Sequence, residues 1–310
     1  MQIIRNISRF ESHTKNHIVT IGNYDGIHLG HQEILKKVST LSQQTGLPNI
    51  LITFEPLPRE YFLEQSMQHY RLMNLREKIN TLKNYGIEKV LILRFNDELA
   101  HLSAESFITQ ILINKLKTKY LVVGEDFKFG HKNSGNVALL QKYSKQLNFQ
   151  LTTVPLYKID SHRVSSTLIR KLLQHDDLAT AAKLLGQQYS VLGRIIHGDH
   201  RGRELGFPTA NIHLTHKIVP LAGVYAVKIH NIANDPLYGV ANIGFRPTTN
   251  NSKRLLEVNI FDFDQDIYHK IVKVEFIYKL RNETKFANFT LLQQQVMQDI
   301  EEAKKYFATT

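Results

Sequence analysis

The chain contains 310 residues, about twice the typical length of one domain, so two domains are expected, each long enough to bury its own core. Its composition, 42% hydrophobic and 22% charged, is that of an ordinary globular protein, and the absence of cysteine excludes disulfides, thiolate metal sites and a cysteine nucleophile. The 39 Lys and Arg against 28 Asp and Glu give a net charge of +11, but the basic residues are scattered along the chain, which disfavours a nucleic-acid-binding protein.

In the first part of the chain, short β-branched runs alternate with helical patterns, which predicts a parallel sheet covered by helices. The expected strands are 18–21, 49–54, 89–93, 120–123 and 151–154. The expected helices are 32–42, 75–85, 104–116, 137–147, 168–173 and 178–185, and the last of them ends at Gly186. We therefore predict an α/β domain over residues 1–186.

From Tyr189 onward, β-rich runs are separated by turns, which predicts an antiparallel sheet or a small barrel. The expected strands are 189–196, 224–230, 238–243, 255–261 and 271–280. A single helix at 291–307 closes the chain. We therefore predict a second domain over residues 187–310.

A glycine-rich turn, residues 22–31, follows the strand at 18–21 and leads into a helix. At the carboxyl end of a parallel strand, such a turn offers backbone N–H groups and a helix dipole to an anion, so phosphate is the expected ligand. His28 and His31 are three residues apart with Gly30 between them, so both imidazoles can point at one phosphate. The segment alone leaves two alternatives open: a helix cap with incidental histidines, or a metal site formed by His28 and His31.

The longer pattern Gly-Asn-Tyr-Asp-Gly-x-His-x-Gly-His at 22–31 resembles the adenylyltransferase module of bacterial FAD synthetases. Further matches to that family follow in the expected order at 53–58, 75–78, 124–130 and 163–170. The resemblance implies a Rossmann-like α/β nucleotidyltransferase fold of the HxGH type. It also implies attack of the FMN phosphate on the α-phosphorus of ATP, assisted by Mg²⁺, to give FAD and pyrophosphate.

The same resemblance implies roles for individual residues. His28 and His31 are the expected catalytic residues, and Phe129 is expected to contact the flavin. Ser165, Ser166 and Thr167 also form a helix-start pattern whose N–H groups and hydroxyls suit phosphate. The residues expected to bind ATP and its phosphates are Gly22, Asn23, Tyr24, Asp25, Gly30, Asp126, Ser165, Ser166, Thr167 and Arg170.

A second glycine-rich segment, residues 193–211, opens the second domain. Its glycines and arginines predict a mobile flap that wraps phosphate. The residues expected in this phosphate loop are Gly198, Arg201, Gly202 and Gly206. Pro208 fixes the approach to Thr209 and Asn211, two neutral oxygen ligands that suit Mg²⁺ together with waters and phosphate. A glycine-rich hairpin with a capping Thr and Asn is the alternative.

This second segment resembles riboflavin kinase, and further matches to that family lie at 223–226, 241–244, 247–248, 256–264 and 280–283. The resemblance implies a small Greek-key β-barrel with a C-terminal helix that phosphorylates riboflavin from ATP. A kinase acting on an alcohol needs a base, because the 5′-hydroxyl of riboflavin must lose a proton while it attacks the γ-phosphorus. Glu257 is the residue that the family uses as this base; an exposed strand glutamate is the alternative interpretation.

Four residues depart from the two family patterns. Tyr24 stands where the first family usually has Phe, and Leu57 stands where it usually has His. The second change removes a contact to the nucleotide, so we expect weakened ATP use in the first domain, not its loss. In the second family, Asn259 replaces the usual His, and His269 adds bulk where a glycine is expected.

The leading hypothesis is a bifunctional enzyme that converts riboflavin to FMN in the second domain and FMN to FAD in the first. One alternative is that a single module is degenerate, and another is an RNA-binding or tRNA-acting protein. The expected partners are riboflavin, FMN, ATP and Mg²⁺, with a weak homo-oligomer left open and neither nucleic acid nor a membrane expected. No apolar run approaches roughly 20 residues and residues 1–5 lack a signal-peptide pattern, so a cytoplasmic location is expected.

Overall fold

The computed structural model describes residues 1–10, 16–63, 71–160, 162–198, 207–214, 219–246 and 253–309. The chain divides into two compact units. The first unit consists of Met1–His69 and Leu75–Ser166, and the second consists of Tyr70–Asn74 and Thr167–Thr310. Across the described residues, none of the helices combines the length and the apolar character that crossing a bilayer requires.

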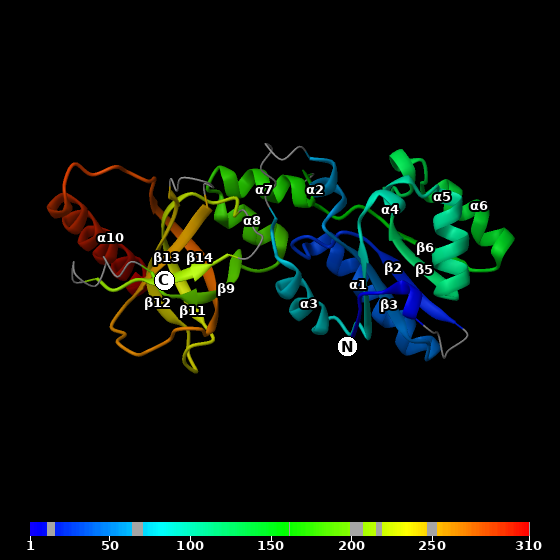
Figure 1. Cartoon of the computed structure of the whole chain (residues 1–310), viewed down its shortest axis with the longest axis horizontal. Helices are drawn as coiled ribbons and strands as arrows, with labels where there is room; N and C mark the ends of the chain where they lie inside the picture. The colour runs from blue at the N-terminus through cyan, green and yellow to red at the C-terminus, as the bar shows by residue number, and fades with distance from the viewer. Residues whose placement is uncertain are drawn as a thin grey trace. The chain divides into compact units, whose positions relative to one another are not determined.

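The first unit is built on a six-stranded parallel sheet with the strand order β1-β4-β3-β2-β5-β6 (Figure 1). Its strands are β1 (Gln2–Ile4), β2 (His17–Ile21), β3 (Asn49–Glu55), β4 (Lys89–Arg94), β5 (Thr118–Gly124) and β6 (Gln150–Val154). All five predicted strands are present. β1 was not predicted, because three residues at a sheet edge carry too short a pattern.

The helices of this unit bury both faces of the sheet, which explains why the central strands are almost continuously apolar. The helices are α1 (Leu29–Thr45), α2 (Pro58–Phe62), α3 (Leu75–Lys83), α4 (Asp97–His101), α5 (Ala104–Ser106), the π-helix η2 (Phe107–Lys115) and α6 (Val137–Leu147). The unit also contains two short helical turns, η1 (Ile7–Arg9) and η3 (His131–Asn133), and a hairpin of β7 (Lys158–Ile159) and β8 (His162–Arg163). Phe107 and Leu140 pack into one core with Val19 and Leu121. α1 contacts β2, β3 and β5.

The direction of strand order reverses at β2, which has β3 on one side and β5 on the other. In a parallel sheet this reversal opens a crevice at the carboxyl ends of the strands, and ligands bind there. The turn after β2 begins at Gly22, and the loop after β5 carries Asp126 and Phe129. The topology therefore brings the two predicted segments to the same edge of the sheet.

The second unit contains a closed six-stranded antiparallel barrel, with the strand order β10-β13-β12-β11-β14-β9. Its strands are β9 (Ser190–Ile196), β10 (Ala210–His213), β11 (Gly223–His230), β12 (Leu237–Arg246), β13 (Lys253–Ile260) and β14 (Ile271–Arg281). The predicted fold class, an α/β nucleotidyltransferase-type domain followed by a small barrel with a C-terminal helix, is confirmed. β10 was not predicted as a strand, because its four residues follow a glycine-rich segment that favours a loop.

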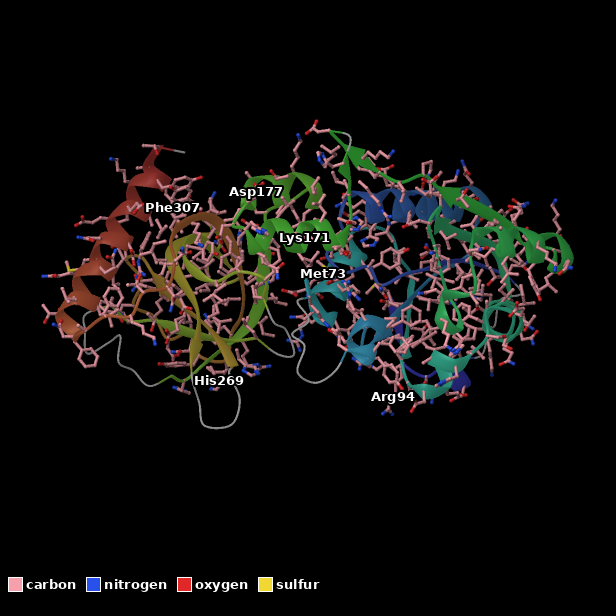
Figure 2. All side chains as sticks on the ribbon, turned by 90° about the horizontal axis from the view of Figure 1, so that it is seen from above. Met73, Arg94, Lys171, Asp177, His269 and Phe307 are labelled. Carbon is pink, nitrogen blue, oxygen red and sulfur yellow. The ribbon has the colours of Figure 1, made fainter. Side chains whose placement is uncertain are left out.

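Two helices, α7 (Ser166–Gln174) and α8 (Leu178–Leu185), precede the barrel, and Thr167–Leu185 clusters with the barrel. Asp176, in the turn between these helices, accepts a hydrogen bond from the Tyr225 hydroxyl at 2.7 Å and pairs with Lys279. Asp177, labelled in Figure 2, caps α8 by accepting the Thr180 N–H at 3.0 Å. α8 ends at Leu185, as predicted, and Gly186 caps it in a left-handed conformation. The domain boundary at Gly186 stays a prediction.

The C-terminal helix α10 (Phe289–Thr309) packs on the outside of the barrel (Figure 1). Ala303 lies in a buried cluster with Val224 and Ala226 of β11. An ion pair reinforces this packing, because the Arg281 guanidinium of β14 donates to both oxygens of Asp299 at 2.8–3.1 Å. The side chains of Asp299 and Arg281 are 4% and 21% exposed, so removal of either partner would leave a charge that is largely shielded from water.

We predict that Asp299→Ala lowers the free energy of unfolding of the barrel unit by about 3 kcal/mol, because it leaves the Arg281 charge without its carboxylate. Urea denaturation measures this change. The matched control is Lys304→Ala on the same helix, which breaks an exposed ion pair with Asp262 and should cost less than about 0.5 kcal/mol. Equal effects of the two substitutions would contradict the prediction.

Candidate active sites

The turn from Gly22 to His28 has an unusual backbone conformation. Gly26 has a φ of 89°, and Tyr24 and Ile27 have φ values of 48° and 42°, in the left-handed region that L side chains rarely adopt. Such strained positions persist where the surrounding structure holds them, and they cluster at ligand sites. α1 begins three residues earlier than predicted, at Leu29, and the His28 side chain caps it by accepting the His31 N–H at 3.3 Å. The helix N-terminus therefore opens directly at the turn.

His28 and His31 lie face to face, with ring centroids 3.7 Å apart and an interplanar angle of 16°. His28 is 7% exposed. Burial lowers the pKa of His31 well below its usual range, and the charges of His28 and Lys78 lower it further. The Nδ1 atom of His31 is buried and makes no hydrogen bond to the described residues, a state that is costly and typical of functional sites. The two imidazoles thus lie together at the turn, and their contact with a phosphate stays a prediction.

The structure accommodates Tyr24, the first departure from the family pattern. Its ring is 1% exposed and lies 5.0 Å from the His31 ring. The hydroxyl is 2.6 Å from Thr20 Oγ1, and burial raises the pKa of Tyr24 above its usual range, so the hydroxyl stays protonated. The additional polar atom is hydrogen-bonded, which explains why Tyr is tolerated where Phe is usual.

Lys78 is a residue of this site that the sequence interpretation did not assign. It lies on α3 and is 2% exposed, and its Nζ donates to the Asn23 carbonyl at 2.6 Å and to Thr53 Oγ1 at 3.2 Å. A buried ammonium requires such partners, because transfer of an unpaired charge from water is unfavourable. The available signal was the family match at 75–78, which ends on this lysine.

The predicted phosphate-binding serines lie at the start of α7. Ser166 donates from its hydroxyl to the Asp25 carbonyl at 2.8 Å, which joins this helix start to the turn after β2. Asp25 is 1% exposed. Thr167 and Arg170 follow on α7 and belong to the second compact unit, so their place in the phosphate site stays a prediction.

Asp126 and Phe129, both in the loop after β5, differ in their exposure to solvent. Asp126 forms an ion pair with Arg163, and their side chains are 42% and 50% exposed. Phe129 is 7% exposed, stacks on Phe127 with ring centroids 5.4 Å apart and also packs against Phe107. Contacts of Asp126 with ATP and of Phe129 with the flavin stay predictions.

In the barrel, strand register aligns three polar residues. Glu257 of β13 lies opposite Asn211 of β10 and opposite Asn242 of β12. Directly opposite residues share one face of a sheet, so the three side chains form a row. Asn211 is 7% exposed, whereas Glu257 and Asn242 are half-buried. Asn242 was not assigned from the sequence, because its position beside Glu257 depends on register.

The predicted phosphate flap is described only in part. Arg201, Gly202 and Gly206 lie outside the described residues. Gly193 lies in β9, within the strand predicted at 189–196, and a Cβ there would be 2.8 Å from the His213 carbonyl oxygen. Gly198 lies against the Asn211 side chain, and a Cβ there would overlap the amide. Glycine at 198 is therefore required for the position of Asn211.

One residue near the predicted Mg²⁺ ligands, Asn259, departs from the family pattern. Thr209 is half-buried and immediately precedes β10. Asn259, which stands where the family usually has His, donates to the Pro208 carbonyl at 2.9 Å. Asn259 thus ties β13 to the residue before Thr209, and the replacement keeps a hydrogen-bond donor at this point.

His269 occupies a turn of the barrel with a φ of 65° (Figure 2). This conformation destabilises a non-glycine residue by about 1 kcal/mol. We therefore predict that His269→Gly raises the free energy of unfolding by about 0.5–1 kcal/mol. The imidazole lies 5.7 Å from the His197 ring. His269→Ala keeps the strained Cβ but removes this contact, so it should not stabilise. Chemical denaturation measures both variants, and a less stable glycine variant would contradict the prediction.

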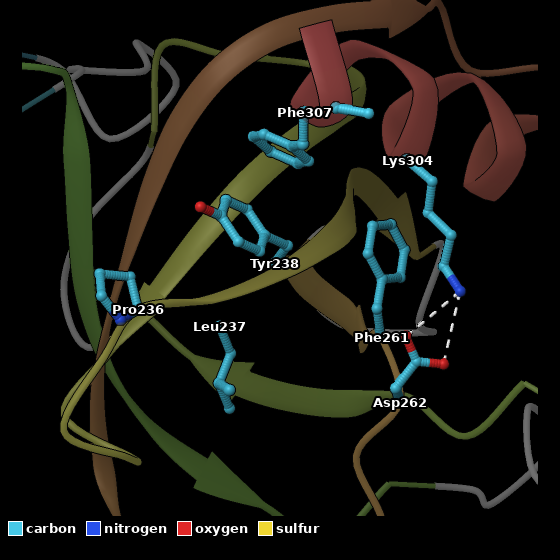
Figure 3. Close-up of a pocket in the computed structure, with 8 residues that line it drawn as sticks. Pro236, Leu237, Tyr238, Phe261, Asp262, Lys304 and Phe307 are labelled. Atoms are coloured by element: carbon cyan, nitrogen blue, oxygen red, sulfur yellow. Dashed lines mark hydrogen bonds and ion pairs between the residues drawn. The ribbon is translucent and has the colours of Figure 1, made fainter. Parts of the chain in front are cut away.

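A separate cavity of about 360 Å³ lies between the barrel and the end of α10 (Figure 3). Its lining residues are Pro236, Leu237, Tyr238, Phe261, Asp262, Lys304, Phe307 and Ala308. The Lys304–Asp262 ion pair crosses its rim. Leu237 is five residues from Asn242 along β12, roughly 17 Å at the usual rise of a strand. None of the predicted site residues lines this cavity.

Fold and site together define a class: an α/β domain with two stacked histidines at the turn after β2, joined to a β-barrel with a row of polar side chains. The comparisons with known proteins agree. A model of the FAD synthetase family matches residues 10–168, and a model of the riboflavin kinase family matches residues 185–307.

Curated relatives match over the full length. The bifunctional riboflavin kinase/FMN adenylyltransferase of Haemophilus influenzae is 44% identical over 99% of both chains. The protein of the same name from Escherichia coli K12 is 38% identical over 100% of this chain and 99% of the relative. A crystal structure titled macrolide-efflux protein, from Streptococcus pneumoniae, is 30% identical, with a TM-score of 0.83 over 98% of both chains. This chain belongs to the bifunctional riboflavin kinase/FMN adenylyltransferase family.

Proposed function

We propose that this chain phosphorylates riboflavin to FMN in its barrel domain and adenylates FMN to FAD in its α/β domain, with ATP as the donor in both steps. The observation that carries the proposal is the stacked His28–His31 pair at the carboxyl end of β2, in a chain that matches both enzyme families. Its expected location is the cytoplasm.

In adenylation, the FMN phosphate attacks the α-phosphorus of ATP, a P–O bond forms to FMN, and pyrophosphate leaves. The nucleophile is already an anion, so no strong base is needed. The chain orients the two phosphates and stabilises the charge of the transition state. We assign the backbone of 22–25 and Gly30, with Ser165–Thr167 and Arg170, to phosphate binding, and His28 and His31 to the α-phosphate. The lowered pKa of His31 makes its imidazole a neutral donor at pH 7.

In riboflavin phosphorylation, the 5′-hydroxyl attacks the γ-phosphorus and ADP leaves. We assign Glu257 as the base that accepts the hydroxyl proton, since a carboxylate on a half-buried strand face can reach a substrate. Asn211 and Asn242 flank it in register and supply amide groups that orient the reacting oxygens. Gly198 leaves room for Asn211, and Arg201, Gly202 and Gly206 are proposed to bind the ATP phosphates.

Mg²⁺ fits the residues at Thr209 and Asn211. Both carry neutral oxygen donors, the Asn211 amide is held in place against Gly198, and Mg²⁺ usually takes one or two protein ligands together with phosphate oxygens and waters. Across the described residues, no group of three or more His, Asp or Glu side chains is arranged to hold a metal ion by itself. When bound, Mg²⁺ would neutralise phosphate charge during transfer.

The test is incubation of the purified chain with riboflavin, ATP and Mg²⁺, followed by chromatography of the flavins. We expect FMN to appear first and FAD to follow. FMN without FAD would identify a degenerate first domain. No reaction of either flavin would contradict the proposed function as a whole.

Leu57 gives a separate prediction for the first domain. Its side chain is 3% exposed at the start of α2, and its N–H is held by Glu60 at 2.9 Å. We expect Leu57→His to raise kcat/KM for ATP in FMN adenylation by up to tenfold, because one added hydrogen bond contributes about 1 kcal/mol. The matched control is Leu57→Met, which keeps an apolar side chain. Unchanged adenylation kinetics of Leu57→His would show that this position does not limit ATP use.

A further inference from the structure

A buried lysine stands behind the phosphate turn of the first unit. Lys78 is 2% exposed, so its ammonium is shielded from solvent. It therefore acts on its buried surroundings, which include the Asn23 carbonyl and the Thr53 hydroxyl.

The contacts of Lys78 converge on one carbonyl. Lys78 Nζ donates to the Asn23 oxygen at 2.6 Å, and Thr53 Oγ1 donates to the same oxygen at 3.3 Å. Asn23 follows Gly22 in the turn that is expected to receive phosphate. A carbonyl oxygen that faced an anion would repel it, so two donors on this oxygen fix the orientation of the peptide and neutralise its negative end.

Lys78 also belongs to the electrostatic surroundings of His31. Among the described residues, the groups near His31 include the stacked His28 ring at 3.7 Å, the Tyr24 ring at 5.0 Å and, from α3, the charge of Lys78. Tyr24 is uncharged at neutral pH, since burial raises its pKa. Lys78 is thus a source of fixed positive charge beside the paired histidines, and a low-dielectric site strengthens its effect.

We propose that Lys78 is a positioning residue for adenylyl transfer: its ammonium holds the Asn23 carbonyl, which fixes the phosphate turn, and its charge favours the α-phosphate beside His31. This inference rests on the proposed adenylyltransferase function and adds a residue to it.

The first experiment compares FMN adenylation by Lys78→Met, Lys78→Arg and the wild-type chain. We expect Lys78→Met to lower kcat/KM for ATP about ten- to a hundredfold, because small displacements of positioning groups have effects of that size. Lys78→Arg keeps the charge and the donors and should recover part of the loss. Lys83→Met, an exposed lysine on the same helix, is the matched control and should behave as wild type. Riboflavin phosphorylation, measured on the same samples, should not change.

The second experiment needs neither ATP nor FMN. The imidazole signal of His31, assigned by its loss in His31→Asn, is titrated by NMR in wild type and in Lys78→Met. Removal of the neighbouring charge should raise the midpoint, while the buried His17 signal reports that the domain is folded. If Lys78→Met does not fold, Lys78→Gln, which keeps a donor but not the charge, replaces it.

Two results would overturn the proposal: an unchanged His31 midpoint, or adenylation by Lys78→Met at the rate of Lys83→Met. Absence of adenylation in the wild-type chain would instead refute the proposed function, and the titration would still decide whether Lys78 acts on His31.

Discussion

His31→Ala should abolish FAD formation while FMN still accumulates from riboflavin. The substitution removes one of two stacked imidazoles that we assign to the α-phosphate, and loss of one such transition-state donor typically lowers kcat 10²–10³-fold. Because Glu257 and its neighbours lie in the other unit, phosphorylation should proceed at the wild-type rate. The measurement is chromatography of both flavins over time with riboflavin, ATP and Mg²⁺.

The chain offers a matched control in the same domain. His101 and His131 form a second stacked pair, with ring centroids 5.1 Å apart, on α4 and η3. His101 is exposed, so His101→Ala removes a comparable imidazole from outside the proposed site. It should leave both activities unchanged. Equal loss in His101→Ala and His31→Ala would point to damage of the domain, not of the site.

Glu257→Ala should abolish FMN formation, while FMN that is added to the reaction is still adenylated. A positioned general base contributes about 10²–10⁴-fold, and no other carboxylate is assigned to this row of the barrel. Glu257→Gln keeps the size and the hydrogen bonding of the side chain but cannot accept the proton, so it should be as inactive as the alanine variant. A Gln variant with near-wild-type phosphorylation would show that Glu257 orients the substrate but is not the base.

The control for this prediction is Glu301→Gln on α10, which removes an exposed carboxylate from the same unit. It should leave both steps intact. If Glu257→Ala lost both steps while Glu301→Gln kept them, the two sites would not be independent. We expect independence, because the two predicted sets of catalytic residues belong to different compact units.

The fold was predicted from sequence patterns that determine local structure. The apolar runs of β2 to β5 are long enough to stand out between the turns. α6 and α8 occupy the predicted residues, because Asn136 and Asp177 cap their starts. β1 and β10 were missed, since three or four residues carry too little signal. The boundary at Gly186 between the two predicted domains rests on the sequence pattern alone.

The candidate sites were predictable only where residues are close in sequence. His28 and His31 share one turn, so their meeting follows from spacing. Lys78 reaches Asn23 from 55 residues away, and Asn242 meets Glu257 through strand register, which sequence patterns do not specify. The ion pair of Asp126 with Arg163 depends on the tertiary fold in the same way.

The most direct test of two activities in one chain is to follow the phosphorus atoms of ATP. The chain is incubated with riboflavin and Mg²⁺, once with ATP labelled at the γ-phosphorus and once with ATP labelled at the α-phosphorus. Because the barrel transfers the γ-phosphoryl group and the α/β domain transfers the adenylyl group, we predict γ-label in both FMN and FAD, and α-label in FAD alone. Release of α-label only as free nucleotide, with no labelled FAD, would contradict this account.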